Sequence, residues 1–185
     1  MPKWADLHSN IPKFEAVSLI INLKGIMLTE KQEHFLERAI ELSWLGMQNG
    51  QGGPFGCVIT KGDEIVGEGY NRVTLTNDPT AHAEVVAIRA ACKKMGTYQL
   101  TDCEVYTSCE PCPMCLGAIY WARPKLVVYA NTREEAAAIE FDDDFIYNEI
   151  NANMADRKIA FVHSPHLKAK AVFDAWKNLE DKQKY

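Results

Sequence analysis

The spacing of apolar residues changes several times along the chain, and each change marks an expected structural element. A capping box formed by Thr29 and Gln32 precedes apolar positions at helical spacing, and this pattern ends at Asn49, before a glycine. Two β-rich stretches, 55–60 and 64–69, follow on either side of a short polar turn. The folded part is therefore predicted to begin with a helix and a β-hairpin.

Helical and extended patterns then alternate to the end of the chain. A second helix is expected to open at residues 78–80, where Asp-Pro-Thr stands before apolar residues that recur on one side. The remaining expected elements are a strand at 104–107, a helix at 113–121, a strand at 126–129, helices at 134–139 and 168–179, and a short apolar run at 159–162. This order predicts an α/β fold in which helices cover both faces of a mixed sheet.

The composition fits a single globular domain. The chain has 185 residues, of which 47% are hydrophobic and 24% charged, which is enough to fill one core. Residues 1–28 differ from the rest, so we expect a flexible N-terminal extension there and a domain at 29–185. An ordered N-terminal helix packed on the domain is the alternative. No uncharged apolar run approaches the roughly 18 residues that cross a bilayer, so no membrane partner is expected.

The charges and cysteines narrow the possible partners and compartment. Twenty Lys and Arg against twenty-five Asp and Glu give a net charge of −5, which argues against a nucleic-acid partner. Six cysteines would allow three disulfides, but that arrangement is typical of small secreted chains without an adequate core. We therefore expect reduced thiols and a cytoplasmic protein.

Two short segments carry the candidate chemistry. One contains His82 and Glu84, the other contains Cys112 and Cys115, and each begins an expected helix. One imidazole and two thiolates are suitable ligands for tetrahedral zinc, and three protein ligands leave the fourth position to water, as in catalytic sites. The two cysteines are three residues apart and share a helical face. The sequence therefore predicts one catalytic Zn²⁺ per chain.

Glu84 is expected to serve the water rather than the metal. It stands two residues after His82, so the two side chains point to different sides of a regular helix, and a carboxylate beside the water can move its protons. Taken alone, Glu84 would be a first-turn glutamate that stabilises the helix dipole. Two alternatives stay open: Cys109 as a fourth ligand that closes the site, and Cys112 with Cys115 as a redox pair.

The H-x-E and P-C-x-x-C segments resemble those of the cytidine-deaminase-like superfamily of zinc deaminases. The likeness to the bacterial-type guanine deaminase family is wider and covers 29–185, which implies a zinc-dependent deaminase domain over these residues. It rests on residues 52–56, 77–84, 107–125 and 141–143. The resemblance implies a three-layer α/β/α fold with a mixed five-stranded sheet and zinc ligands at the starts of two helices.

The same resemblance implies the hydrolytic deamination of guanine to xanthine and ammonia. It assigns zinc to His82, Cys112 and Cys115, catalysis to Glu84 and Asp143, and substrate binding to Phe55, Asn71, Ala83, Asp143 and Tyr185. It also implies a homodimer that exchanges its C-terminal segment, so that Tyr185 closes the site of the partner.

Other interpretations remain for the pocket and for the activity. Without the resemblance, Phe55 would be a core residue, Asn71 a turn residue, and 142–144 a solvated loop. Guanosine, cytosine or tRNA adenosine are alternative substrates. A non-catalytic zinc module and a thiol redox protein are alternatives of a different class.

Overall fold

The computed structural model describes residues 27–141 and 143–184. In chain order its elements are α2 (Glu30–Gln48), β1 (Gly56–Lys61), β2 (Glu64–Tyr70), α3 (Val73–Thr76), α4 (Ala83–Met95), β3 (Cys103–Cys109), α5 (Pro113–Ala122), β4 (Leu126–Asn131), α6 (Arg133–Ala137), α7 (Asp144–Asn151), the 3₁₀ turn η2 (Met154–Asp156) and α8 (Leu167–Asn178). Residues 1–26 of the expected N-terminal extension lie outside the described residues, so the extension stays a prediction.

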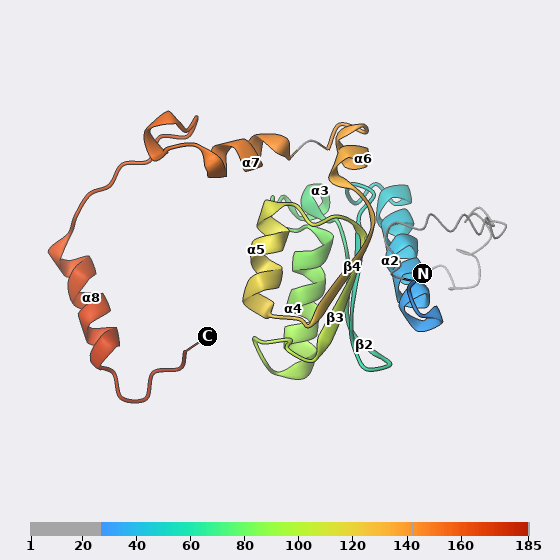
Figure 1. Ribbon diagram of the computed structural model, residues 1–185, viewed down its shortest axis with the longest axis horizontal. Helices are drawn as coiled ribbons and strands as arrows, with labels where there is room; N and C mark the ends of the chain where they lie inside the picture. The colour runs from blue at the N-terminus through green and yellow to red at the C-terminus, as the bar shows by residue number, and fades with distance from the viewer. Residues whose placement is uncertain (1–26, 142, 185) are drawn as a thin grey trace.

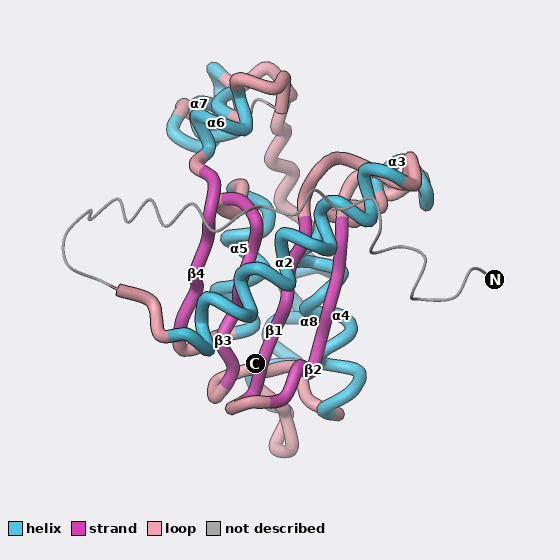
Figure 2. Tube along the Cα trace, turned by 90° about the vertical axis from the view of Figure 1, so that its right-hand side faces the viewer, coloured by secondary structure: helices cyan, strands magenta, loops and turns pink. Residues whose placement is uncertain are grey.

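The strands form a mixed sheet between two layers of helices. Its order is β2-β1-β3-β4; β1 is antiparallel to both of its neighbours, whereas β3 and β4 are parallel. Helix α2 crosses one face of the sheet, and α4 and α5 cover the other (Figures 1 and 2). Strand β1 is buried on both sides over all but its last residue, as this arrangement requires. The three-layer α/β/α fold is therefore confirmed.

The expected fifth strand is not found in the described part of the chain, where the sheet has four strands. The apolar run at 159–162 lies instead in a loop between η2 and α8. Ile159 is 73% exposed and Val162 88% exposed. A strand needs a neighbouring strand that satisfies its backbone hydrogen-bonding groups, and this run does not lie beside the sheet. Its hydrophobicity alone is therefore not enough to make it a strand.

The first helix begins as expected, and the second begins later than expected. Both hydrogen bonds of the Thr29 capping box are present, at 3.2 and 3.0 Å. The carboxylate of Asp78 accepts the amide hydrogen of Thr80 at 2.8 Å and so closes a local turn. Because of this turn the chain stays non-helical through His82, and α4 begins at Ala83.

Two helices were absent from the sequence prediction. Helix α3 has only four residues, too few for a periodic pattern to emerge. Helix α7 (Asp144–Asn151) begins within the acidic segment 142–144, for which a solvated loop was the alternative without the resemblance. Both helices lie beside the candidate site described below.

Close packing of α4 on β2 fixes the start of that helix. A Cβ atom at Gly69 would lie 2.5 Å from the carbonyl oxygen of Ala83 and 2.7 Å from the amide nitrogen of Ala87. A glycine is therefore needed at this point for the helix backbone to approach the strand. The apolar cluster beneath contains Cys57, Ile59 and other buried side chains of the sheet. It holds the residues at the start of α4 in a fixed position above the sheet.

The chain after α6 leaves the helices and sheet as an extended arm (Figure 1). Helix α8 on this arm is exposed over its whole length, including Phe173 at 79% and Trp176 at 48%. The tail then returns to the far end of α4, where the carbonyl of Lys184 accepts a hydrogen bond from the Tyr98 hydroxyl at 3.1 Å. Among the described residues, no helix combines the length and the apolar character that a membrane span requires.

Candidate metal centre and base pocket

The three expected metal ligands meet where α4 and α5 begin. His82 Nδ1 lies 3.5 Å from Cys112 Sγ and 3.6 Å from Cys115 Sγ. Their ligand atoms all lie within 4.8 Å of one another, and within the described ranges they form the one group of this kind. One nitrogen and two sulfur donors gathered around a common point suit a single tetrahedral zinc ion. The residues present therefore fit the zinc that the sequence predicts.

The local backbone explains how these side chains converge. His82 and Cys112 occupy the position just before their helices, with extended backbone, and Pro113 opens α5 at a position that needs no amide hydrogen. Cys115 lies one turn further along and is fully buried. Hydrogen bonding from the Cys115 thiol, together with His82, lowers the pKa of Cys112 to about 4. Cys112 therefore already favours the thiolate form that binds a metal, whereas the same hydrogen bond and burial raise the pKa of Cys115, which would lose its proton when a metal binds.

Glu84 lies next to this cluster without being part of it. The side chain is buried in the first turn of α4, and one carboxylate oxygen is 3.3 Å from Cys115 Sγ. Burial raises the pKa of Glu84, which makes it a better proton carrier near neutral pH than an exposed glutamate. The carboxylate is placed to serve a ligand at the metal rather than the metal itself.

Cys109 does not join the three ligands. It is the last residue of β3, and its sulfur lies 3.7 Å from the carbonyl oxygen of Thr132. Burial raises the pKa of Cys109 to about 11, so it remains a neutral thiol. This arrangement favours a site with three protein ligands over the closed four-ligand alternative.

A cavity of about 460 Å³ opens in front of the cluster. Its walls come from the loops before and after the hairpin, the starts of α4 and α5, and the segment from α6 to α7. The lining residues are Gly53, Phe55, Asn71, Val73, Thr74, His82, Glu84, Cys109, Glu110, Cys112, Arg133, Ala136, Glu140, Phe141, Asp143, Phe145 and Ile146. Its size is in the range of small-molecule sites, and several polar side chains converge in it.

Phe55 and Asn71 both face this cavity, as the sequence predicts. The rings of Phe55 and Phe141 meet edge to face, with centroids 4.9 Å apart at 89°. The oxygen of the buried Asn71 side chain accepts amide hydrogens from Val73 at 3.2 Å and Gly53 at 3.4 Å. These two bonds fix the amide, so that its nitrogen is the end left to donate to a ligand.

Asp143 reaches the same cavity from the start of α7. It precedes the helix in the capping position, yet its carboxylate makes no capping hydrogen bond. Burial and the negative charge of Cys112 raise the pKa of Asp143. The carboxylate is therefore directed to the cavity rather than used in the helix.

Of the predicted substrate-binding residues that the structure describes, Ala83 is the one that does not line the cavity. Ala83 is fully buried between His82 and Glu84, so only its backbone could meet a ligand. Tyr185 lies outside the described residues. Sequence analysis also missed Glu110, Arg133 and Ile146, which line the cavity. Glu110 lies within the segment 107–125 that carries the resemblance, although no role was assigned to it. No motif identifies Arg133 or Ile146, since their approach to the metal ligands depends on the path of the chain after β4.

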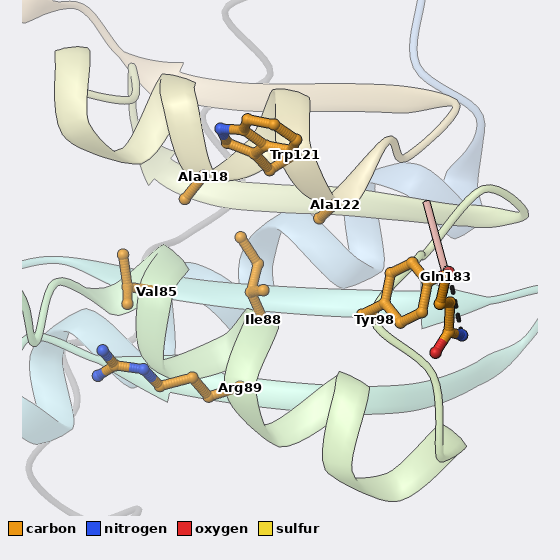
Figure 3. Close-up of a pocket in the computed structure, with 8 residues that line it drawn as sticks. All are labelled: Val85, Ile88, Arg89, Tyr98, Ala118, Trp121, Ala122 and Gln183. Carbon is orange, nitrogen blue, oxygen red and sulfur yellow. Dashed lines mark hydrogen bonds between the residues drawn. The ribbon is translucent and has the colours of Figure 1, made fainter. Parts of the chain in front are cut away.

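A second hollow, of about 660 Å³, lies between α4 and α5 on the outside of the molecule (Figure 3). It is lined mainly by apolar and aromatic side chains, such as Ile88 and Trp121, with the tail residue Gln183 at one end. None of the candidate ligands or proton carriers faces it. The chemistry therefore belongs to the first cavity.

Comparison with known families agrees with this geometry. Residues 29–131 match the family described as the cytidine and deoxycytidylate deaminase zinc-binding region. The chain belongs to this family of zinc-dependent deaminases.

Individual relatives resemble the chain over different lengths. A guanine deaminase of Bacillus subtilis (strain 168) is 56% identical over 153 residues, which cover 83% of this chain and 98% of the relative. The X-ray structure of guanine deaminase from Bacillus subtilis superposes with a TM-score of 0.81 at 54% identity, covering 85% of this chain and 99% of that one. A tRNA-specific adenosine deaminase of Aquifex aeolicus (strain VF5) is 37% identical, over 54% of this chain and 65% of its own.

Proposed function

We propose that the protein hydrolyses guanine to xanthine and ammonia. The observation that carries the proposal is the meeting of His82, Cys112, Cys115 and Glu84 at the base of a cavity with aromatic and amide walls. The 56% identity to a guanine deaminase over most of both chains supports guanine as the substrate. Guanosine is the nearest alternative, because a cavity of about 460 Å³ has room for more than a purine base.

Each residue at the metal has a part in this reaction. A zinc ion held by His82, Cys112 and Cys115 would supply a water molecule whose pKa is lowered to about 7. Glu84 takes a proton from the attacking water and gives it to a ring nitrogen of guanine as the bond to C2 forms. Glu84 then takes the proton of the new C2 hydroxyl and passes it to the exocyclic amine, so that the bond from C2 to this nitrogen breaks, ammonia leaves and a carbonyl remains at C2. The buried position of Glu84 keeps this transfer away from bulk water.

The walls of the cavity select and orient a flat base. Phe55 offers an aromatic surface for stacking, and Asn71 offers an amide N–H to an acceptor on the purine. The Ala83 backbone amide belongs to the first turn of α4, whose amides have no partner within the helix, so it suits a carbonyl oxygen. Asp143 accepts from an N–H of the base and assists proton transfer. Together these contacts read the edge of guanine.

We also propose a homodimer in which the C-terminal arm of each chain, with Tyr185, closes the pocket of the other. The apolar residues of α8 face solvent in a single chain, which supports a partner surface for them. Gln183 and Lys184 lie at Tyr98, beyond the end of α4 opposite to His82, about 20 Å along the helix. In a single chain the tail therefore lies too far from the metal ligands to close the cavity of that same chain. The apolar hollow of Figure 3, next to Tyr98 and Gln183, supports a surface there that a second chain could contact.

The six cysteines are all free thiols, which supports the expected cytoplasmic location. The net charge of −5 continues to argue against a tRNA substrate, despite the 37% identity to a tRNA-specific adenosine deaminase over about half of the chain.

Ammonia release from guanine, guanosine, cytosine and cytidine tests the proposed activity. We expect guanine to be the preferred substrate and the zinc content to be one ion per chain. A preference for guanosine would mean that the protein is a guanosine deaminase instead. A metal-loaded protein inert towards all four would favour the non-catalytic alternative, and a protein without metal would favour a redox pair.

A further inference from the structure

Helix α7 follows directly after Asp143 and is not among the helices that pack on the sheet, so its position needs another explanation. Its first turn joins Asp143 to Tyr147, since the carbonyl of Asp143 accepts the amide hydrogens of Ile146 at 2.9 Å and Tyr147 at 3.4 Å. If the backbone of this short helix turned at Tyr147, Asp143 would therefore turn with it. What holds Tyr147 decides where the Asp143 carboxylate lies.

The holding contact comes from α6. The guanidinium carbon of Arg133 lies 5.1 Å from the centre of the Tyr147 ring, a cation–π contact. Nε of Arg133 also donates to Glu134 at 3.1 Å, which restricts the guanidinium. Tyr147 is half-buried and is not part of the cavity wall, so its ring serves this contact rather than a ligand.

Arg133 is in turn tied to the metal-binding loop. The amide hydrogen of Arg133 is accepted by Glu110 Oε2 at 3.2 Å. Glu110 stands two residues before Cys112, and its own amide donates to the carbonyl of Asn131 at 2.8 Å. A continuous series of contacts therefore runs from the metal-binding loop through Arg133 and Tyr147 to Asp143.

We infer that Arg133 and Tyr147 are positioning residues that fix Asp143 relative to the metal centre. The inference rests on the proposed function, because it takes Asp143 to act on the substrate. On the other side of Asp143, Phe141 packs against Phe55, so the segment is held at two points. A small displacement of a reacting group can cost two orders of magnitude in rate, so even a modest contact matters here.

The test compares single and double variants on whichever base the wild type deaminates best. Tyr147→Leu removes the ring and should lower kcat about tenfold, while zinc content and melting temperature change little. Tyr147→Phe keeps the ring and should restore most of the activity. The same change at an exposed tyrosine of β4, Tyr129→Leu, is the matched control and should leave kcat unchanged.

The Asp143→Asn background shows whether Tyr147 acts through Asp143. There, Tyr147→Leu should cause no further loss, because the group that it positions is already disabled. A further tenfold loss in that background would overturn the inference, as would full activity of Tyr147→Leu alone.

Arg133→Gln gives a second route if Tyr147→Leu folds poorly. It should lower kcat to a similar extent in the wild type and not at all in the Asp143→Asn background. Loss in both backgrounds would mean that Arg133 touches the substrate itself, and the inference would fail. Failure of the proposed function is recognised separately, since the wild type would then release no ammonia from guanine.

Discussion

Glu84 is a buried carboxyl group on the wall of the cavity. The residue is 6% exposed, and burial raises its pKa, while hydrogen bonds from the backbone and from Cys115 and the charge of His82 act in the opposite direction. A group of this kind can hold a proton for part of a reaction and then release it. Position relative to the metal, rather than the residue type, distinguishes it from an ordinary first-turn glutamate.

Glu84→Gln should keep the shape of the site and remove its proton carrier. We expect zinc content to stay at one ion per chain and turnover to fall by about 10²–10⁴-fold, the usual contribution of such a group. Metal analysis and ammonia release measure the two effects. Activity close to that of the wild type would refute the role assigned to Glu84.

The cysteines near the site should differ sharply in their effect on metal content. Cys112→Ala removes a ligand and should abolish stoichiometric zinc, whereas Cys109→Ala should retain one zinc per chain, because its sulfur lies outside the cluster. Inductively coupled plasma analysis of both purified variants checks this. Loss of zinc from the Cys109 variant would favour the four-ligand site instead.

At the scale of elements, the distance between α4 and the sheet decides whether the residues of the site come together. Two of its functional groups, His82 and Glu84, lie at the end that contacts Gly69. The atoms that would oppose a side chain there belong to the helix backbone, which cannot move aside as a flexible side chain can. Stability and activity should therefore respond together to a change at this point.

Gly69→Ala should force α4 away from β2. We expect the free energy of unfolding to fall by about 1–3 kcal/mol and turnover to fall with it. Gly117→Ala on α5 is the matched control: nothing lies within 4 Å of its added Cβ, so it should raise stability by about 0.5–1 kcal/mol. Thermal or urea unfolding of both variants measures the difference. If the two variants were equally stable, α4 would be able to move away from β2 without loss, and the prediction would be wrong.

At the scale of the whole molecule, the arm after α6 carries a helix whose apolar side chains face solvent. The apolar side chains of α8 are exposed, whereas those of α2 and α4 are buried against the sheet. Burial of such a surface on a second copy would stabilise both the arm and the dimer.

Deleting Tyr185 should weaken turnover substantially while the dimer stays mostly intact, because the apolar helix α8 remains. Light scattering and ammonia release check the two outcomes, and Tyr185→Phe, which keeps the ring, is the control. Full activity after the deletion would remove the proposed role of the tail in closing the pocket.

Mixed dimers test whether the tail acts on its own chain or on the partner. A Glu84→Gln chain with an intact tail, refolded together with a chain lacking Tyr185, should regain activity if the tail acts across the dimer. The intact pocket of the second chain then receives the tail of the first. No gain over the separate variants would mean that each tail serves its own pocket.

The amino-acid sequence by itself determined the local structure and the metal ligands. The capping box at Thr29, the hairpin and the start of the helix after Cys112 depend on neighbouring residues, so their patterns are visible in the chain. The helix after His82 was expected to open already at 78–80, so its existence was predicted but its first residue was not. The ligand atoms were predictable because their residue types and spacing follow from zinc chemistry.

Only the tertiary structure decided which distant segments complete the pocket. Arg133 carries no local pattern, and its place on the cavity wall depends on where α6 lies after the chain leaves β4. Its contact with the Tyr147 ring depends in the same way on where α7 lies. The same reason explains the run at 159–162, which has the apolar character of a strand but no sheet edge to pair with. Local preference is written in neighbouring residues, whereas pairing and pocket walls depend on long-range contacts that form only when the chain folds.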